Sequence, residues 1–144
     1  MKLALGLGCD RGTPRETLAQ AVDLALAQIG ATLADVAAVA SITLKADELG
    51  LLALAAERGW SMHFYNPAEL AAMPVPNPSE TVRRHTGTPS VSEAAALLAA
   101  GAADASALRV EKLRHRAADG RNATVSIAQM AFQPIFPSPL KELT

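Results

Sequence analysis

Residues 3–30 read "LALGLGCDRGTPRETLAQAVDLALAQIG", and this stretch decides the fold. The segment 3–7 is short and apolar and runs into glycines, which is typical of a buried strand. Residues 13–29 then place apolar side chains every three or four positions, the spacing of one helix face, and Gly30 ends that helix. A buried strand that leads directly into an amphipathic helix is the opening of a parallel strand–helix–strand unit.

The same alternation continues along the chain. Further strands are predicted at 36–42, 61–65, 108–115 and 124–130, and further helices at 47–58, from Pro67, from Pro78 and from about Val91 to Gly101. The polar stretch "RAADGRN" joins the last two strands as a hairpin. We therefore expect an α/β fold of three layers, α/β/α, in which a mostly parallel mixed sheet with a C-terminal β-hairpin carries helices on both faces.

The length and composition indicate one domain. A chain of 144 residues, 50% of them hydrophobic, can bury a core of its own without disulfides or a metal. We expect residues 1–131 to form a single α/β domain. Residues 132–144 contain three prolines, and we expect them to form an extended tail.

The net charge, the hydropathy and the N-terminal sequence argue against several classes of partner. The net charge of −1 gives the chain no general attraction to nucleic acid or to anionic lipid. No apolar run approaches the roughly 20 residues that span a bilayer, and the N-terminus does not resemble a signal peptide. A single cysteine suits a reducing compartment. We therefore expect a cytoplasmic protein with neither nucleic-acid nor membrane partners.

Four helix starts share one pattern, a capping residue followed three positions later by glutamate. They read "TPRE" from Thr13, "NPAE" from Asn66, "NPSE" from Asn77 and "SVSE" from Ser90. This spacing predicts capping boxes. Ordinary capping is enough to explain the pattern in each helix alone.

The turns after the first three strands, "GCDRGT", "LKADE" and "YNPAE", are expected to meet. The helices of a parallel sheet begin at its carboxyl edge, where the ligands of open α/β proteins bind. Helix N-termini present backbone N–H groups and a partial positive charge there. Arg11, Lys45 and Lys112 add full charges, so the sequence indicates recognition of carboxylates or phosphates. The run "RVEKLRHR" around Lys112 is either a solvated strand face or a positive wall beside such a ligand.

The sequence does not match the known motifs that bind nucleotides or phosphate groups. Gly6, Gly8 and Gly12 are spaced one residue longer than the dinucleotide fingerprint, no acid closes the second strand, and no lysine follows Gly12 as in a P-loop. "CDRGTPR" has the cysteine–arginine spacing of cysteine phosphatases, but Pro14 removes a loop amide and no Asp-Pro general-acid loop is present. Cys9 is then a small, partly buried residue at the turn. We expect no metal, since the three histidines, His63, His85 and His115, share no ligand spacing. We also expect no cofactor, because the sequence contains no cofactor-binding signature.

Five segments occur in the order and spacing of a known family: "GLGCDRGT", "ASITLKADELGLLALA", "VPNPSE", "GTPSVSEAAALLAAG" and "ATVSIA". On these segments, which lie within residues 3–130, the chain resembles the CbiG/CobE family of cobalamin (vitamin B12) biosynthesis. More narrowly, it resembles the stand-alone form of that family, which is similar to the C-terminal domain of the cobalt-precorrin hydrolase CbiG. Asp10 departs from the family pattern, because members often carry a basic residue there.

The resemblance implies a ligand and a set of site residues. Precorrins are macrocycles fringed with acetate and propionate groups, so a precorrin site must meet many carboxylates. The donors at matching motif positions are Arg11, Thr13, Lys45, Ser79, Thr88, Ser90 and Lys112. The same segments bring Gly8, Cys9, Gly12, Asn77 and Gly87 to the expected site. The acids Asp47, Glu48, Glu80 and Glu93 are expected to cap helices, bind ring N–H groups or assist proton transfer.

Three functions follow from the resemblance, and no catalytic residue is assigned for any of them. The first is a protein that binds a precorrin or corrin intermediate and either assists its conversion or passes it on in the pathway. The second is a hydrolase-type enzyme that acts on the lactone of the macrocycle. The third is a docking module for another corrin-pathway enzyme, with the proline-rich tail as a candidate surface.

Overall fold

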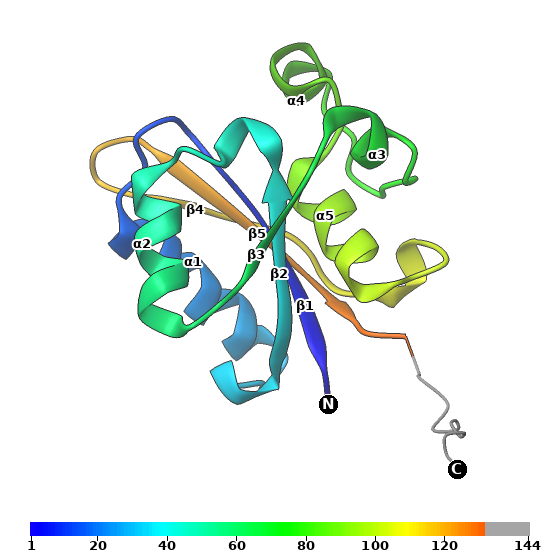
Figure 1. Cartoon of the computed structure of the whole chain (residues 1–144), viewed down its shortest axis with the longest axis horizontal. Coiled ribbons are helices and arrows are strands. Elements are labelled where there is room, and N and C mark those ends of the chain that lie inside the picture. The colour runs from blue at the N-terminus through cyan, green and yellow to red at the C-terminus, as the bar shows by residue number, and fades with distance from the viewer. Residues whose placement is uncertain (132–144) are drawn as a thin grey trace.

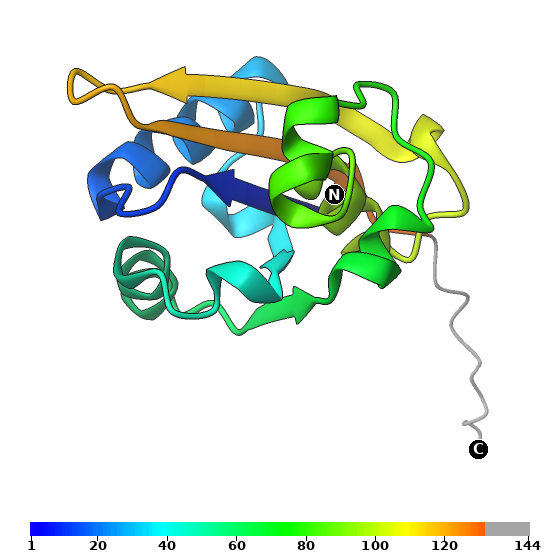
Figure 2. The same cartoon turned by 90° about the horizontal axis from the view of Figure 1, so that it is seen from above.

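The sheet is built outward from its central strand, β1 (Leu3–Cys9), in this computed structural model, which describes residues 1–131. On one side, β1 pairs in parallel with β2 (Val36–Ile42), and β2 pairs in parallel with β3 (Met62–Tyr65). On the other side, β1 pairs antiparallel with β5 (Asn122–Gln129), which pairs antiparallel with β4 (Leu108–Arg116). The strand order is therefore β3-β2-β1-β5-β4 (Figure 2). Four of the five strands run in one direction, which confirms the predicted mostly parallel mixed sheet with a C-terminal hairpin.

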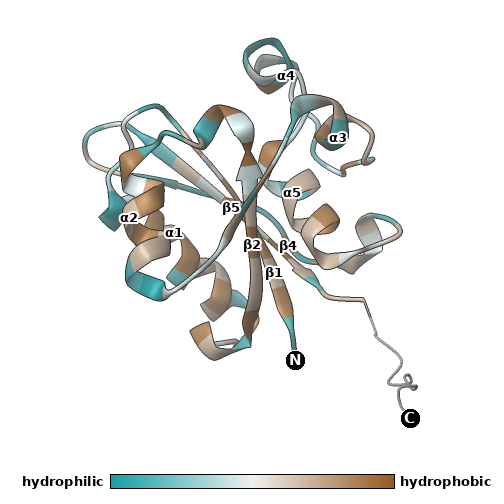
Figure 3. Cartoon of the chain, viewed as in Figure 1, coloured by the Kyte–Doolittle hydropathy of each residue, from teal (hydrophilic) through white to brown (hydrophobic). Residues whose placement is uncertain are grey.

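Helices cover both faces of the sheet, as predicted (Figure 1). The crossover helices α1 (Arg15–Gln28) and α2 (Leu49–Arg58) lie on one face. The other face carries α5 (Val91–Ala100) together with two short helices, α3 (Pro67–Ala71) and α4 (Glu80–Thr86). Hydrophobic residues run through the strands and the packed helices, whereas α4 and the turns at the same edge are hydrophilic (Figure 3).

The alternation "LALGLG" in β1 explains why the two faces of the sheet pack their helices differently. Leu3, Leu5 and Leu7 point toward α1 and α2 and are fully buried in the larger core. The intervening positions are Ala4, Gly6 and Gly8, which leave room for a close approach by the alanine-rich helix α5. A Cβ atom on Gly6 would lie 1.9 Å from the backbone oxygen of Ser92. Small residues in β1 therefore fix α5 directly against the sheet.

The predicted boundaries are confirmed to within about two residues, the usual precision for element ends. β1 continues through Gly8 to Cys9, and the first two long helices begin two residues later than expected, at Arg15 and Leu49. Three short 3-10 turns were not predicted: Leu33–Asp35, Thr43–Lys45 and Ala105–Ala107. Among the helices of residues 1–131, none has both the length and the apolar character needed to cross a membrane. The predicted tail at 132–144 lies outside the described residues.

Only one of the four predicted capping boxes forms. Asn66 accepts a hydrogen bond from the Glu69 amide at 2.8 Å, and the Glu69 carboxylate accepts one from the Asn66 amide at 2.9 Å. The prediction is wrong at the other three starts, because each expected capping residue lacks its cap or has another partner. The Thr13 hydroxyl donates to the Asp10 carbonyl, Asn77 lies before the start of α4, and the hydroxyl of Ser90 caps nothing.

Candidate functional site

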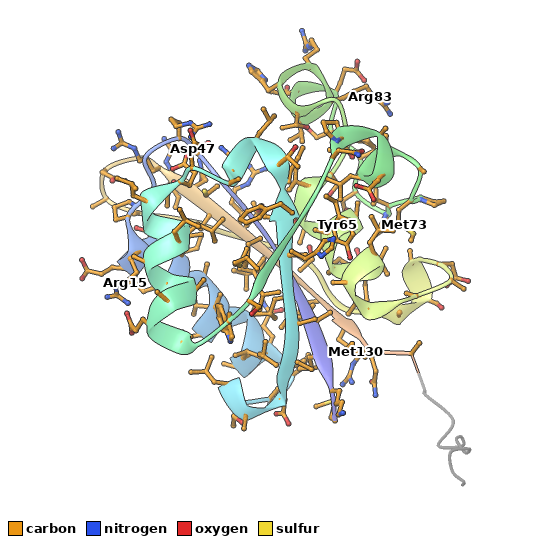
Figure 4. All side chains as sticks on the ribbon, in the orientation of Figure 1. Arg15, Asp47, Tyr65, Met73, Arg83 and Met130 are labelled. Atoms are coloured by element: carbon orange, nitrogen blue, oxygen red, sulfur yellow. The ribbon has the colours of Figure 1, made fainter. Side chains whose placement is uncertain are left out.

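The glycine turn after β1 and the lysine-bearing turn after β2 meet at the carboxyl edge of the sheet. Arg11 donates one hydrogen bond to Asp47 at 2.8 Å and another to the Leu44 carbonyl at 3.0 Å. The Gly12 amide donates to Glu48 at 3.0 Å. Asp47 and the α4 residue Arg83 lie toward the same edge of the molecule (Figure 4). The expected convergence of these two turns is confirmed.

Glu48 is the buried centre of this contact, with 3% of its side chain exposed. Its Oε2 lies 2.8 Å from Arg11 Nη1, an ion pair without hydrogen-bond geometry, and 3.9 Å from Lys45 Nζ. The hydrogen bond to Arg11 also lowers the pKa of Asp47 below its ordinary value and raises that of Arg11. Two of the three cations that the sequence assigned to this rim, Arg11 and Lys45, are therefore already paired with carboxylates.

The start of β5 and Arg121, the residue before it, hold the glycine turn from the other side. Asp10 Oδ2 accepts hydrogen bonds from the Asn122 backbone amide at 2.7 Å and from the Asn122 side-chain amide at 3.1 Å. Arg121 Nε donates to the Arg11 carbonyl at 3.1 Å. Asp10, the residue that departs from the family pattern, thus has a structural partner that the sequence did not reveal.

A cavity of about 480 Å³ opens at this edge, between the glycine turn, β4, β5, α4 and the start of α5. Its volume lies within the range of roughly 300–1,000 Å³ typical of small-molecule sites. Five of the residues expected from the sequence line it: Gly8, Cys9, Arg11, Lys45 and Lys112. Ten more were not predicted: Asp10, Thr81, Val82, His85, Thr86, Val91, Ser92, Arg114, Asn122 and Thr124.

Positive charge dominates the cavity wall. Arg11, Lys45, Lys112 and Arg114 face a single acid, Asp10, which is turned toward Asn122. Burial is the main cause that lowers the pKa of Lys112, while Glu93 opposes this effect and Arg114 adds to it. A wall of this charge suits an anionic ligand, and a bound carboxylate would relieve the repulsion between Lys112 and Arg114.

The other expected residues surround the cavity without lining it. Gly12, Thr13, Asp47 and Glu48 build the two turns, and the rest lie around α4 and the start of α5: Asn77, Ser79, Glu80, Gly87, Thr88, Ser90 and Glu93.

Several residues of this second group have structural partners. The fully buried Glu93 accepts hydrogen bonds from the Asn77 amide at 3.2 Å and from its side-chain amide at 2.6 Å. Ser79 caps α4 through the Val82 amide at 3.2 Å, and Gly87 ends α4 in the left-handed conformation. Asn77 and Glu93 therefore tie the segment before α4 to α5, and α4 forms one wall of the cavity.

Two signals in the sequence could have identified some of the missed residues. Arg114 follows Lys112 by two positions in a predicted strand, so both face the same side. Thr81 and His85 are four apart on a predicted helix and share one face, and His85 Nδ1 contacts the Thr81 carbonyl at 2.8 Å. Nothing in the sequence shows that α4 would lie opposite β4.

Cys9 contributes a protonated thiol to the cavity. Burial is the main cause that raises its pKa from 9.0 to about 11, since the positive charge of Lys45 offsets it only in part. The thiol is therefore not an activated nucleophile near neutral pH. Within residues 1–131, no group of three or more acidic, histidine or cysteine side chains is arranged to hold a metal ion.

Two known proteins are similar in sequence to this chain. A cobalt-precorrin-5A hydrolase from Priestia megaterium is 41% identical over 100 residues, which cover 69% of this chain and 27% of that protein. Protein CobE from a Sinorhizobium species is 42% identical over 101 residues, covering 69% of this chain and 66% of the relative. The chain thus spans about a quarter of the length of the hydrolase and about two thirds of that CobE.

Solved structures of cobalamin-biosynthesis proteins have the same fold as this chain. The crystal structure of CobE, a protein from the cobalamin biosynthetic pathway, superposes with a TM-score of 0.76 at 36% identity, covering 92% of this chain and 93% of the other. The cobalamin biosynthesis protein chiG from Agrobacterium tumefaciens superposes with a TM-score of 0.62 at 34% identity, covering 90% and 99% of the two chains. The family model described as "Cobalamin synthesis G C-terminus" matches residues 3–128. The chain therefore belongs to this family of cobalamin-biosynthesis proteins.

Proposed function

We propose that this protein binds a precorrin or corrin intermediate of cobalamin biosynthesis and holds it by the carboxylate arms of the macrocycle. The observation that carries the proposal is the charge of the cavity. Four cationic side chains line a single hollow, although the whole chain has a net charge of −1. Family membership supplies the class of ligand, and the cavity supplies the groups that would recognise it.

The lining also suits the uncharged part of such a ligand. Val82 and Val91 offer apolar surface, while Thr81 and Thr124 offer hydroxyl groups. A macrocycle with a flat ring and acidic arms needs both kinds of contact. Arginine binds a carboxylate through two parallel hydrogen bonds, and lysine binds it as a point charge. We infer that the ring edge lies against α4 and the start of α5, with the acidic arms toward β4 and the glycine turn.

Binding is favoured over hydrolysis by the chemistry of the cavity residues. The Cys9 thiol is protonated at neutral pH, because burial raises its pKa to about 11. Among the described residues, no hydrogen bond joins His85 to a hydroxyl or thiol group of the cavity, as an activated nucleophile would require. We therefore propose a carrier or assisting role.

The proposal is tested with two corrins that differ only in their arms. Cobyrinic acid ends in carboxylates, whereas cobinamide carries amides on the same ring system. We expect the full chain to bind cobyrinic acid at least roughly tenfold more tightly than cobinamide, a difference of about 1.4 kcal/mol. Binding is followed by the change in corrin absorbance. Equal affinity for the two corrins, or no binding of either, contradicts the proposal.

A further inference from the structure

The strand β4 contains an irregularity where it passes the cavity. Val110 pairs with Ile127 and Leu113 pairs with Val125, so two residues of β4, Glu111 and Lys112, stand opposite the single residue Ser126. One extra residue on one strand of an antiparallel pair is a β-bulge, which re-aims the side chains beside it. Bulges of this kind are common next to functional sites.

The bulge sets which face each β4 side chain occupies. Val110 and Leu113 are three positions apart, yet both pack in the core on the α1 side of the sheet. In a regular strand, residues three apart face opposite sides. Because the bulge absorbs one residue, Lys112 and Arg114 both face the opposite side, where they line the cavity. His115 faces the α1 side again and contacts Gln20 at 2.8 Å.

Two buried hydroxyl groups hold the bulge. The Ser126 hydroxyl donates to the Glu111 carbonyl in a short hydrogen bond and lies 2.9 Å from the Ser92 hydroxyl. Ser126 has one hydroxyl proton and a carbonyl can only accept, so Ser92 donates to Ser126. Both serines are buried, with at most 1% exposed. Through them, α5 and β5 fix the backbone from which Lys112 and Arg114 project.

Lys112 and Arg114 are also the two cavity cations that are not already neutralised. Among the described residues, the ion pairs within 4.0 Å include Arg11 and Lys45 but neither of these two. They are two positions apart in the strand, which places their Cα atoms about 6.5 Å apart. That separation lets neighbouring arms of one ligand each meet a separate cation.

We propose that Lys112 and Arg114 form a clamp for two carboxylates of one ligand, and that Ser126 is the positioning residue that aims the clamp by holding the bulge. The clamp deepens the proposed function and rests on it for the identity of the ligand. Arg11 and Lys45 then act mainly in the ion-paired junction of the two turns, with Glu48 at its centre.

The clamp is tested by titrating the Lys112→Gln, Arg114→Gln double variant with cobyrinic acid. We expect its affinity to fall roughly tenfold to a hundredfold, the effect of losing charge-assisted hydrogen bonds. The matched control is Arg109→Gln, Arg116→Gln, which removes the same charge from the same strand but from residues that do not line the cavity. It should change affinity by less than about twofold.

Citrate, a small tricarboxylate, separates failure of the clamp from failure of the proposed function. NMR titration of the wild type should show citrate shifting the resonances of Lys112 and Arg114. If citrate binds there and cobyrinic acid does not, the clamp stands and the proposed function is wrong. If the double variant keeps its full affinity for both ligands, the clamp is wrong and the proposed function stands. If the wild type binds neither, both are overturned.

The positioning role of Ser126 is tested by combining its substitution with those of Lys112 and Arg114. Ser126→Ala should weaken cobyrinic acid binding in the wild type but have no further effect when Lys112 and Arg114 are already replaced, a coupling of roughly threefold or more. Val125→Ala, on the opposite face of β5, should combine additively with the clamp substitutions. Ser92→Ala removes the donor to Ser126 and serves as a second variant if Ser126→Ala folds poorly. Additive behaviour of both serine variants overturns the positioning role.

Discussion

At the scale of single residues, burial determines what Cys9 can do. Its thiol lies at the end of β1 on the cavity wall, and burial raises its pKa to about 11. Because only the thiolate is nucleophilic, we expect iodoacetamide to alkylate Cys9 slowly at pH 8 and much faster as the pH approaches 11. Mass spectrometry of the modified peptide gives the rate at each pH. Alkylation at pH 8 as fast as that of a free thiol would show that the site is more open than the structure indicates.

The same shift in pKa predicts how stability depends on pH. In the unfolded chain the Cys9 thiol ionises near its ordinary pKa of 9.0, whereas in the folded protein it holds its proton up to about 11. The folded state therefore binds the proton more strongly, and the stabilisation is complete below pH 9 and lost as the pH rises to 11. Urea unfolding should show a steeper decline over this window in the wild type than in Cys9→Ala, which lacks the group. Parallel declines would contradict the prediction.

Glu48 provides a third test at the residue scale. Its carboxylate accepts the Gly12 amide and pairs with Arg11 and Lys45, so it competes with any anionic ligand for both cations. Glu48→Gln keeps an oxygen for Gly12 but removes the charge. We expect this variant to bind cobyrinic acid more tightly, by up to roughly tenfold, and to be less stable. Asp47→Asn is the control, since Asp47 is exposed and its one ion pair within residues 1–131 is with Arg11. Weaker binding by Glu48→Gln would mean that the ion-paired turn must stay intact for binding.

At the scale of elements, the contact of β1 with α5 depends on Gly6. A Cβ atom there would lie 1.9 Å from the Ser92 oxygen and 2.6 Å from the Ala96 nitrogen, and neither backbone atom can move unless α5 moves. We expect Gly6→Ala to lower the free energy of unfolding by about 3 kcal/mol or more, at the upper end for overpacked cores. Gly101→Ala is the matched control. Its Cβ meets open space, so only the left-handed φ of +67° costs stability, by about 1–2 kcal/mol. Similar losses in urea unfolding would contradict this account.

Element boundaries were predictable from the sequence, but side-chain partners at the helix starts were not. Strand and helix periods follow from local spacing, and they placed β1, α1 and the hairpin correctly. A capping residue, by contrast, bonds whichever group lies nearest in the folded chain. Thr13 donates to Asp10, and Asn77 contacts Glu93 and Glu111, both far away in the sequence. The bulge at Glu111 and Lys112 left only a faint signal, the three-residue step from Val110 to Leu113, and the register shift between Leu108 and Val110 left none.

At the scale of the whole molecule, the sequence located five of the fifteen residues that line the cavity. The two turns that follow β1 and β2 belong to a parallel strand–helix–strand unit, and the topology of that unit requires them to meet at one edge. The opposite wall comes from α4, β4 and β5, which are distant in sequence. These elements face the two turns because the β4–β5 hairpin pairs with β1. The hairpin could instead have been added to the sheet next to β3. No local pattern fixes that choice, so Asn122 and Thr124 were missed.

The last prediction concerns where ligand binding changes the dynamics of the whole chain. None of the residues of α4 is buried, whereas β1 and α5 are packed on both sides, so amide hydrogen exchange should be fastest in α4 and slowest in the central strands. Cobyrinic acid bound in the cavity should slow exchange in three separate segments: α4, the turn at 10–13 and the middle of β4. The protein has a second hollow on the α1 side, lined by Gln20, Asp23, Leu24 and His115, which serves as an internal control. If protection appeared there and the cavity segments stayed unchanged, the ligand would bind on the opposite face of the sheet, and the charges at the carboxyl edge would have no part in recognition.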